Sequence, residues 1–551
     1  MQRILPGKYG SKINVAIVAL NSFVAGLCAA WPSAIFPIII NKSHLVHLNL
    51  DEISLSVIFL YVGQLVSLLP FSTVESAIGK AKTLEFGIIF AILGWVVIIL
   101  FVNNLGIYFA MLLFGCWLTI CFLSNGPYLA EVSPPRLRGR TLALMSIFYM
   151  LGAITEITMS IFLSYKGLAL ANFALTIFQF SLLFSLPETP YYYLRKYNIR
   201  TAFQRFEWFR GSGPSNKKEF DDAVTFTEKQ MNASSKLTDV CRDFSTRKAL
   251  FFSLTMACFQ KTSANTPLQT YCGILLPNSF IKSAMFPLLF FSVSAVFNIL
   301  SALFIDRFGR RKLLLISASG SCTLSICSAV WFFVQERTHT VLNEHYNFIP
   351  YMTLILETAF YSLGVQYIPG VINGELFAVH IKSKALSIIS LVQITVNIIN
   401  SKIFIVLVQN KLTFLSFTVY SIVSAVSFFY HVSIFDTKGK TLEEIYNHFE
   451  RKGRRRSTLV ANLLPQKDGG SILPSEERFE DEKQETSTPK DGGVYRLSWT
   501  FGNVSSDIHV PYRKRSSSVP NSPSVQTEKS RSPSPVRLKP LTTQKNEPNT
   551  K

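Results

Sequence analysis

The segment Thr83–Arg140 reads TLEFGIIFAILGWVVIILFVNNLGIYFAMLLFGCWLTICFLSNGPYLAEVSPPRLRGR. It contains two apolar runs, at about 83–102 and 105–128, followed by a basic segment. A helix needs roughly 20 apolar residues to cross the hydrocarbon core of a bilayer. Ten other runs have a similar length, at about 13–40, 53–74, 141–165, 168–186, 248–274, 283–305, 313–334, 350–373, 385–408 and 412–434. The pattern predicts an all-α membrane protein with twelve transmembrane helices in two sets of six.

The composition supports a membrane protein and argues against an enzyme. Of the 551 residues, 49% are hydrophobic and 16% are charged, whereas soluble proteins carry about 25% charged residues. The net charge of +20 lies in short segments between apolar runs and in the C-terminal tail, as membrane topology produces, so it does not indicate nucleic-acid binding. The eight cysteines lack metal-ligand spacing. With no nucleophile elbow or phosphate-binding loop in the sequence, we expect no enzyme activity, metal or cofactor.

Lysine and arginine residues predict the orientation of the chain. If both termini are cytosolic, most basic residues before Asp436 lie on the cytosolic side. Five basic residues lie on the outer side, namely Lys42, Lys166, Lys282, Arg337 and Lys411. Two more, Lys261 and Lys402, lie within spans. Because basic loops stay preferentially in the cytosol, we predict a multi-pass protein of the cell membrane with both termini cytosolic.

The two sets of spans repeat one another. Glu131 precedes Arg138 by seven residues after the fourth span, and the same spacing separates Glu375 from Lys382 after the tenth. Gly79-Lys80 in the first set of spans corresponds to Gly309-Arg310 in the second, and Glu188 corresponds to Asp436. Parallel repeats of this kind are typical of transporters whose halves rock around a site at the membrane midplane.

The chain divides into four predicted segments. A six-helix bundle at 1–186 is followed by a polar cytosolic linker with short helices at 187–247, and a second bundle occupies 248–445. The remaining segment, 446–551, is rich in Ser, Pro, Lys and Glu and has few apolar clusters. Such a composition buries too little apolar surface to fold, so we predict a disordered cytosolic tail.

Five motifs resemble those of the sugar porter family of the major facilitator superfamily. They are Tyr128–Arg140 (YLAEVSPPRLRGR), Pro187–Tyr191 (PETPY), Asp306–Lys312 (DRFGRRK), Gly374–Phe377 (GELF) and Asp436–Ile445 (DTKGKTLEEI). They occur in order and at the expected helix ends, and the resemblance covers about residues 13–445. Details such as Trp31 and Pro37 resemble the insect facilitated trehalose transporter-like branch. The resemblance implies the major facilitator fold and solute transport by alternating access.

The resemblance also implies a gate of charged side chains at the cytosolic helix ends. Carboxylates and basic groups there would pair when the two halves close on the inside and separate when they open. The candidate gating residues are Glu131, Arg138, Glu188, Asp306, Arg310, Arg311, Glu375 and Lys382. The alternative is a set of ordinary positive-inside residues with solvated partners, because exposed ion pairs contribute only about 0–1 kcal/mol each. Their clustering and symmetry favour the gate.

The substrate site implied by the resemblance is only partly present. Sugar porters bind hydroxyl groups with Gln, Asn and aromatic side chains, and the candidates here are Gln260, Lys261, Asn265, Tyr271, Ser146, Gln393 and Asn397. Gln260 matches the family, whereas Ser146 stands where a Gln is expected and Gly370 replaces a Trp. A lone amide in a span is also explained by an interhelical hydrogen bond.

Three functions remain open. The first is facilitative transport of a trehalose- or hexose-like sugar. The second is transport of an anionic metabolite with Lys261 as counter-charge, because an ionisable residue within a span is costly and usually functional. The third is a transport-dead nutrient sensor that signals through its tail. Proton-coupled members of the family carry an Asp in the first span where this chain has Cys28, so facilitated diffusion is the default. Glu156 is the best remaining carboxylate within a span, and a structural role for it is as consistent with the sequence as proton coupling.

Two modifications are predicted outside the spans. Asn41-Lys42-Ser43 is a glycosylation sequon in the first outer loop. In the tail, Arg515–Pro520 (RSSSVP) matches a pattern read by phosphoserine-binding adaptors, which predicts phosphorylation of Ser518. A chance match in low-complexity sequence is the alternative. The expected partners are therefore a small-molecule substrate, the lipid bilayer and such an adaptor, without nucleic acid.

Overall fold

The computed structural model describes residues 8–42, 48–133, 138–211, 213–232, 244–276, 285–337, 346–377 and 379–432. These residues belong to one compact unit, and the regular elements among them are helices. Ser518 and the rest of the predicted tail lie outside the described residues.

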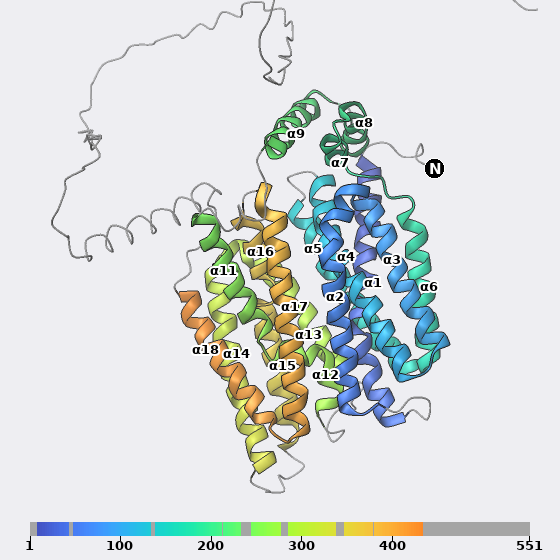
Figure 1. The fold of residues 1–551 in the computed structure, drawn as a ribbon. Helices are drawn as coiled ribbons and strands as arrows, with labels where there is room; N and C mark the ends of the chain where they lie inside the picture. Colours follow the sequence, from blue (N-terminus) through green and yellow to red (C-terminus); the bar gives the residue numbers. More distant parts are fainter. Residues whose placement is uncertain are drawn as a thin grey trace, which may run out of the picture. The chain divides into compact units, whose positions relative to one another are not determined.

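The first bundle consists of six long helices: α1 (Lys8–Lys42), α2 (Leu50–Ile78), α3 (Lys80–Leu100), α4 (Asn104–Val132), α5 (Arg138–Phe162) and α6 (Tyr165–Leu183). Three linker helices follow among the described residues: α7 (Pro190–Arg195), α8 (Ile199–Arg210) and α9 (Pro214–Asn232). Figure 1 shows them beyond one end of the long helices, here called the linker end. The opposite end, where α1 ends and α2 begins, is called the distal end. Helix α1 packs mainly on α5, and α4 packs on α2 and α3.

In the part of the chain that the structure describes, the second bundle contains eight helices: α11 (Phe244–Lys261), α12 (Asn265–Leu275), α13 (Met285–Phe308), α14 (Arg310–Arg337), α15 (Phe348–Leu363), α16 (Ile368–Leu376), α17 (Val379–Gln409) and α18 (Thr413–Val432). Helix α14 packs on α15 and α18, and α11 packs on α17. The two bundles lie side by side, with α2 against α17 and α1 against α12 (Figure 1).

Eleven segments among the described residues are long and apolar enough to cross a membrane. The predicted span at 248–274 is not one of them because it is divided, with α11 ending at Lys261 and α12 beginning at Asn265. The predicted span at 350–373 is also broken, between α15 and α16, and Pro369 lies in the first turn of α16. Helix breaks at membrane depth leave backbone groups that the protein itself must satisfy. These two breaks position the polar side chains described below.

Small residues let the helices of the first bundle approach closely. A Cβ on Gly63 of α2 would lie 2.0 Å from a carbonyl oxygen of α4, and a Cβ on Gly115 of α4 would lie 1.9 Å from a carbonyl oxygen of α2. Gly26 and Gly152 form the same reciprocal pair between α1 and α5, with distances of 2.1 Å. Since lipid provides no hydrophobic drive between helices, such close backbone packing is a main source of their association.

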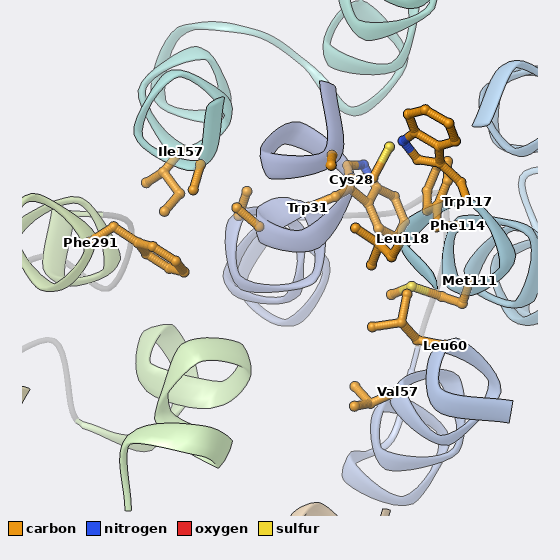
Figure 2. Close-up of a cluster of buried hydrophobic side chains, with 14 of the residues drawn as sticks. Cys28, Trp31, Val57, Leu60, Met111, Phe114, Trp117, Leu118, Ile157 and Phe291 are labelled. Atoms are coloured by element: carbon orange, nitrogen blue, oxygen red, sulfur yellow. The ribbon is translucent and has the colours of Figure 1, made fainter. Parts of the chain in front are cut away.

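Trp31 on α1 lies at the centre of the first bundle's core. Its ring makes edge contacts with Trp95, Phe114 and Tyr165, at centroid distances of 6.3, 6.1 and 6.4 Å. Figure 2 shows Cys28 beside it, and the Cys28 side chain is fully buried. Cys28 therefore packs as a small apolar residue.

Candidate functional site

Gln260, near the end of α11, is the centre of a hydrogen-bond network around the two helix breaks. Its Nε2 donates to the carbonyl oxygens of Val365 (3.2 Å) and Gln366 (2.8 Å), in the break between α15 and α16. Its Oε1 accepts a hydrogen bond from Nε2 of Gln393 on α17, at 3.0 Å. The Tyr361 hydroxyl donates to its backbone carbonyl at 2.8 Å. The structure thus brings together two predicted binding residues, Gln260 and Gln393.

Gln366 belongs to the same network and was not predicted from the sequence. Its Oε1 accepts hydrogen bonds from the hydroxyls of Ser362 (2.7 Å) and Ser294 (3.3 Å). These two hydroxyl oxygens lie 3.0 Å from each other. The sequence signal that could have identified Gln366 is its place between Gly364 and Pro369, which mark a helix break.

Asn400 on α17 forms hydrogen bonds with backbone carbonyls at the other break, between α11 and α12. Its Nδ2 donates to the carbonyl oxygens of Lys261 (2.8 Å) and Ser263 (3.2 Å), and its Oδ1 accepts from the Tyr420 hydroxyl (2.9 Å). Lys261 is half-buried. Its ammonium makes no hydrogen bond or ion pair with any described residue. Lys261, which follows Gln260 in the chain, therefore has no protein counter-charge in the described part of the chain.

The other predicted binding residues take no part in this network. Asn265, the first residue of α12, is 1% exposed, and neither its Nδ2 nor its Oδ1 has a partner among the described residues. Asn397, one helical turn beyond Gln393, is also buried, and its Oδ1 lacks a described partner. Ser146 on α5 is half-buried and makes no hydrogen bond with a described residue.

Tyr271 lies in a contact between the two bundles at the distal end. Its ring is stacked with Phe36 of α1 and with Phe404 of α17, at centroid distances of 6.5 and 6.1 Å. Close by, Ser33 Oγ of α1 lies 3.4 Å from Cys272 Sγ of α12. Tyr271 therefore forms part of the closed distal contact instead of the Gln260 network.

Charged and apolar side chains extend this contact. Lys402 Nζ of α17 lies 3.5 Å from Asp51 Oδ1 of α2. Figure 2 shows Ile157 of α5 near Phe291 of α13, and both belong to the apolar cluster that contains Trp31. Buried residues of α11 and α16 belong to separate clusters confined to the second bundle. Among the described residues, the shared apolar core thus joins the bundles toward the distal end.

Glu188 connects the start of the linker with the start of α3. Its carboxylate accepts hydrogen bonds from the backbone N–H groups of Lys80 (3.0 Å), Ala81 (2.9 Å) and Thr189 (3.0 Å). A carboxylate at a helix N-terminus satisfies unpaired amides and complements the helix dipole. Gly79 makes room for it, because a Cβ there would lie 2.4 Å from Glu188 Oε2. Burial raises the pKa of Glu188, while the three backbone amides and Lys80 act in the opposite direction.

Glu131, near the end of α4, pairs within the first bundle and the linker. Its Oε1 lies 2.7 Å from Lys80 Nζ and 3.6 Å from a guanidinium nitrogen of Arg195 on α7. The Lys80 and Glu131 side chains are 7% and 16% exposed. Tyr128 adds a hydrogen bond from its hydroxyl to the Pro187 carbonyl oxygen, at 2.7 Å. These contacts attach the linker to the first bundle through partners that the sequence did not predict.

The gating residues of the second bundle are described in part. Arg311 donates to the backbone carbonyl of Val432 at the end of α18, and Arg310, the first residue of α14, is half-buried. The side chains of Arg138, Asp306, Glu375 and Lys382 lie outside the described residues, as does that of Asn41. Pairing between gating residues of the two bundles therefore stays a prediction.

Sequence relatives of this chain are membrane transporters. The family profile described as "Sugar (and other) transporter" matches residues 8–449. The facilitated trehalose transporter Tret1 of Apis mellifera ligustica is 27% identical over 393 residues, which cover 70% of this chain and 77% of the relative. Sugar transporter ERD6-like 7 of Arabidopsis thaliana is 22% identical over 437 residues, covering 79% and 92% of the two chains.

Solved structures share the fold. The proton:xylose symporter XylE bound to 6-bromo-6-deoxy-D-glucose has a TM-score of 0.65 at 14% identity, covering 79% of this chain and 99% of that chain. An inward open conformation of XylE from E. coli has a TM-score of 0.63 at 15% identity, covering 78% and 98%. The likeness confirms the predicted all-helical major facilitator fold, and the family profile places the chain among transporters and not enzymes. The chain therefore belongs to the sugar (and other) transporter family.

Proposed function

We propose that the protein is a facilitative carrier of a small, hydroxyl-rich solute, a trehalose- or hexose-like sugar, in the plasma membrane with both termini cytosolic. The observation that supports this best is the amide network of Gln260, Gln366 and Gln393 at the two helix breaks. Neutral amides offer the donors and acceptors that neutral hydroxyl groups require. Relatives named as trehalose transporters support the same substrate class.

Transport would follow alternating access. In the proposed cycle the distal contact around Tyr271 opens, while the gating residues named above pair across the linker end. Facilitated diffusion fits the buried Cys28 in the first span. It also fits Glu156, which is fully buried and whose Oε1 accepts a hydrogen bond from Asn172 Nδ2 at 3.0 Å within the first bundle.

An anionic metabolite is the second candidate substrate, and Lys261 is the observation that favours it. The lysine follows Gln260 directly, and its ammonium has no partner among the described residues. A substrate carboxylate would supply the missing counter-charge. In a sugar carrier, the same position would instead donate a hydrogen bond to a hydroxyl group.

Counterflow into proteoliposomes distinguishes these functions. Purified protein preloaded with unlabelled trehalose, glucose or a dicarboxylate is exposed to the labelled form of the same solute. We expect accumulation of a labelled sugar, and the variant Lys261→Gln should retain it because an amide still offers a donor. Loss of dicarboxylate accumulation in Lys261→Gln would instead favour the anion carrier. Absence of counterflow for every solute would favour a sensor that signals through its tail.

A further inference from the structure

Gln260 has no donor left for a substrate in this structure, and only one lone pair of its side-chain oxygen remains. Backbone carbonyls only accept, so the two bonds to Val365 and Gln366 identify its donor nitrogen and use both amide hydrogens. The Gln260 oxygen must then accept, and it does so from Gln393. The conformation of the α15–α16 break thus fixes the orientation of the Gln260 amide.

The same argument fixes the Gln393 amide. Its nitrogen donates one hydrogen to Gln260, so its Oε1 is an acceptor that remains for another partner, beside the second amide hydrogen. That oxygen has no described partner and is not among the buried atoms that lack one, so it retains surface accessible to solvent. Gln393 therefore presents an acceptor.

Gln366 presents the complementary donor. Its Oε1 is occupied by the hydroxyls of Ser294 and Ser362. Its Nε2 has no described partner and is likewise not buried. Both glutamines flank Gln260, since Gln366 bonds it through the backbone carbonyl and Gln393 through the side chain. Hydroxyl groups both donate and accept, so those of one sugar molecule match a donor on Gln366 and an acceptor on Gln393.

We propose that Gln366 is a substrate-binding residue that acts with Gln393, and that Gln260 is a positioning residue that holds both. The proposal rests on the proposed function for the nature of the substrate. The question of which of the three side chains faces solvent is independent of that function. These two parts are tested separately.

Matched Gln→Cys variants test which side chain faces solvent. In a background without the eight native cysteines, each variant is exposed to a small, hydrophilic methanethiosulfonate reagent. Gln204→Cys on α8 is the exposed control, and Gln179→Cys on α6, 2% exposed in the wild type, is the buried control. We expect Gln366→Cys and Gln393→Cys to react and Gln260→Cys to resemble the buried control. Reaction of Gln260→Cys as fast as Gln366→Cys, or no reaction of Gln366→Cys, overturns the proposal.

Protection by solute tests substrate contact. Trehalose or glucose, whichever shows counterflow in the wild type, should slow labelling at 366 and 393 and leave Gln204→Cys unchanged. In counterflow, Gln366→Leu should raise the half-saturation concentration about three- to tenfold, as expected for one lost hydrogen bond, with little change in maximal rate. Labelling that the transported sugar does not slow rules out contact at Gln366. If the wild type carries neither sugar, the proposed function fails, and the labelling pattern alone still decides which glutamine faces solvent.

Discussion

At the scale of single residues, position 79 requires glycine for two reasons, its backbone conformation and the lack of space for a side chain. Its φ and ψ of 92° and 167° lie in a region that only glycine adopts readily, and a Cβ would overlap the Glu188 carboxylate. Gly211 provides a matched control, because it has φ and ψ of 82° and 167° but a Cβ there would meet nothing within 4 Å.

We therefore expect Gly79→Ala to destabilise the purified protein more than Gly211→Ala does. Backbone strain alone should lower the free energy of unfolding by about 1–3 kcal/mol in both variants. Gly79→Ala should lose more, because Glu188 must withdraw from the first turn of α3. Thermal unfolding in detergent measures the difference. Equal losses in the two variants would show that Glu188 can move without cost.

Sequence and structure differ most at individual polar side chains. Gln260 and Gln393 were predicted as binding residues from the resemblance, and the structure brings them together. Whether an amide is free to bind, however, depends on what its neighbours accept and donate, which the sequence does not contain. Gln366 was missed for that reason: Gly364 and Pro369 mark the break in the sequence, but its hydrogen-bond partners are visible only in the structure.

At the scale of helices, both breaks have a proline signal in the sequence. Gly364 and Pro369 are sequence signals for the break between α15 and α16. The residues Thr262–Ala264, between α11 and α12, contain neither Gly nor Pro, but Pro267 follows in the first turn of α12 and has no N–H to donate to the Ser263 carbonyl. A single span was predicted at 248–274 because the run is long and apolar, and Pro267 was overlooked. Asn400 donates to two backbone carbonyls at the break.

Helices α3, α4 and α7 meet at a charge pair that a double-mutant cycle can test. Glu131→Gln leaves the Lys80 ammonium, 7% exposed, with no carboxylate at 2.7 Å, and Lys80→Met leaves Glu131 with the more distant Arg195. Removing one member of a buried pair costs more than removing both. The double variant should therefore be more stable than the sum of the single losses predicts, with a coupling of about 1–3 kcal/mol. Additive losses in thermal unfolding would mean that the pair contributes little.

At the scale of the whole molecule, periodicity, basic residues and motifs were enough to predict an all-α major facilitator protein. The contacts between the bundles could not be predicted, because they join residues far apart in the sequence. Ser33 and Cys272 are separated by 239 positions, and neither has a distinctive neighbourhood in the sequence. Which end of the bundles is closed depends on the state of the protein and not on the residue pattern.

The closed distal contact predicts a cross-link between the bundles. Ser33 Oγ lies 3.4 Å from Cys272 Sγ, so Ser33→Cys would place a second thiol beside the native one. Mild oxidation should form a disulfide and stop counterflow, because the distal end could no longer open. Reduction should restore transport, and Ser33→Cys with Cys272→Ala should not respond to oxidant. A cross-linked protein that still transports would exclude separation of α1 from α12 during the cycle.

The same cross-link reports on the ion pair between Asp51 and Lys402. This pair is exposed, at 72% and 41%, with 3.5 Å between its atoms, so it should stabilise the closed distal end by about 0–1 kcal/mol. That range corresponds to at most about a fivefold change in the equilibrium between closed and open states. In the Ser33→Cys background, Lys402→Asp should slow disulfide formation by up to that factor for the lost attraction, and repulsion between the two aspartates should add to it. Charge reversal at both positions, Asp51→Lys with Lys402→Asp, should restore the rate.

High salt should reduce the difference between the parent and Lys402→Asp, since exposed charges are screened. A double reversal as slow as the single variant would show that the attraction between these two charges does not help to close the distal end.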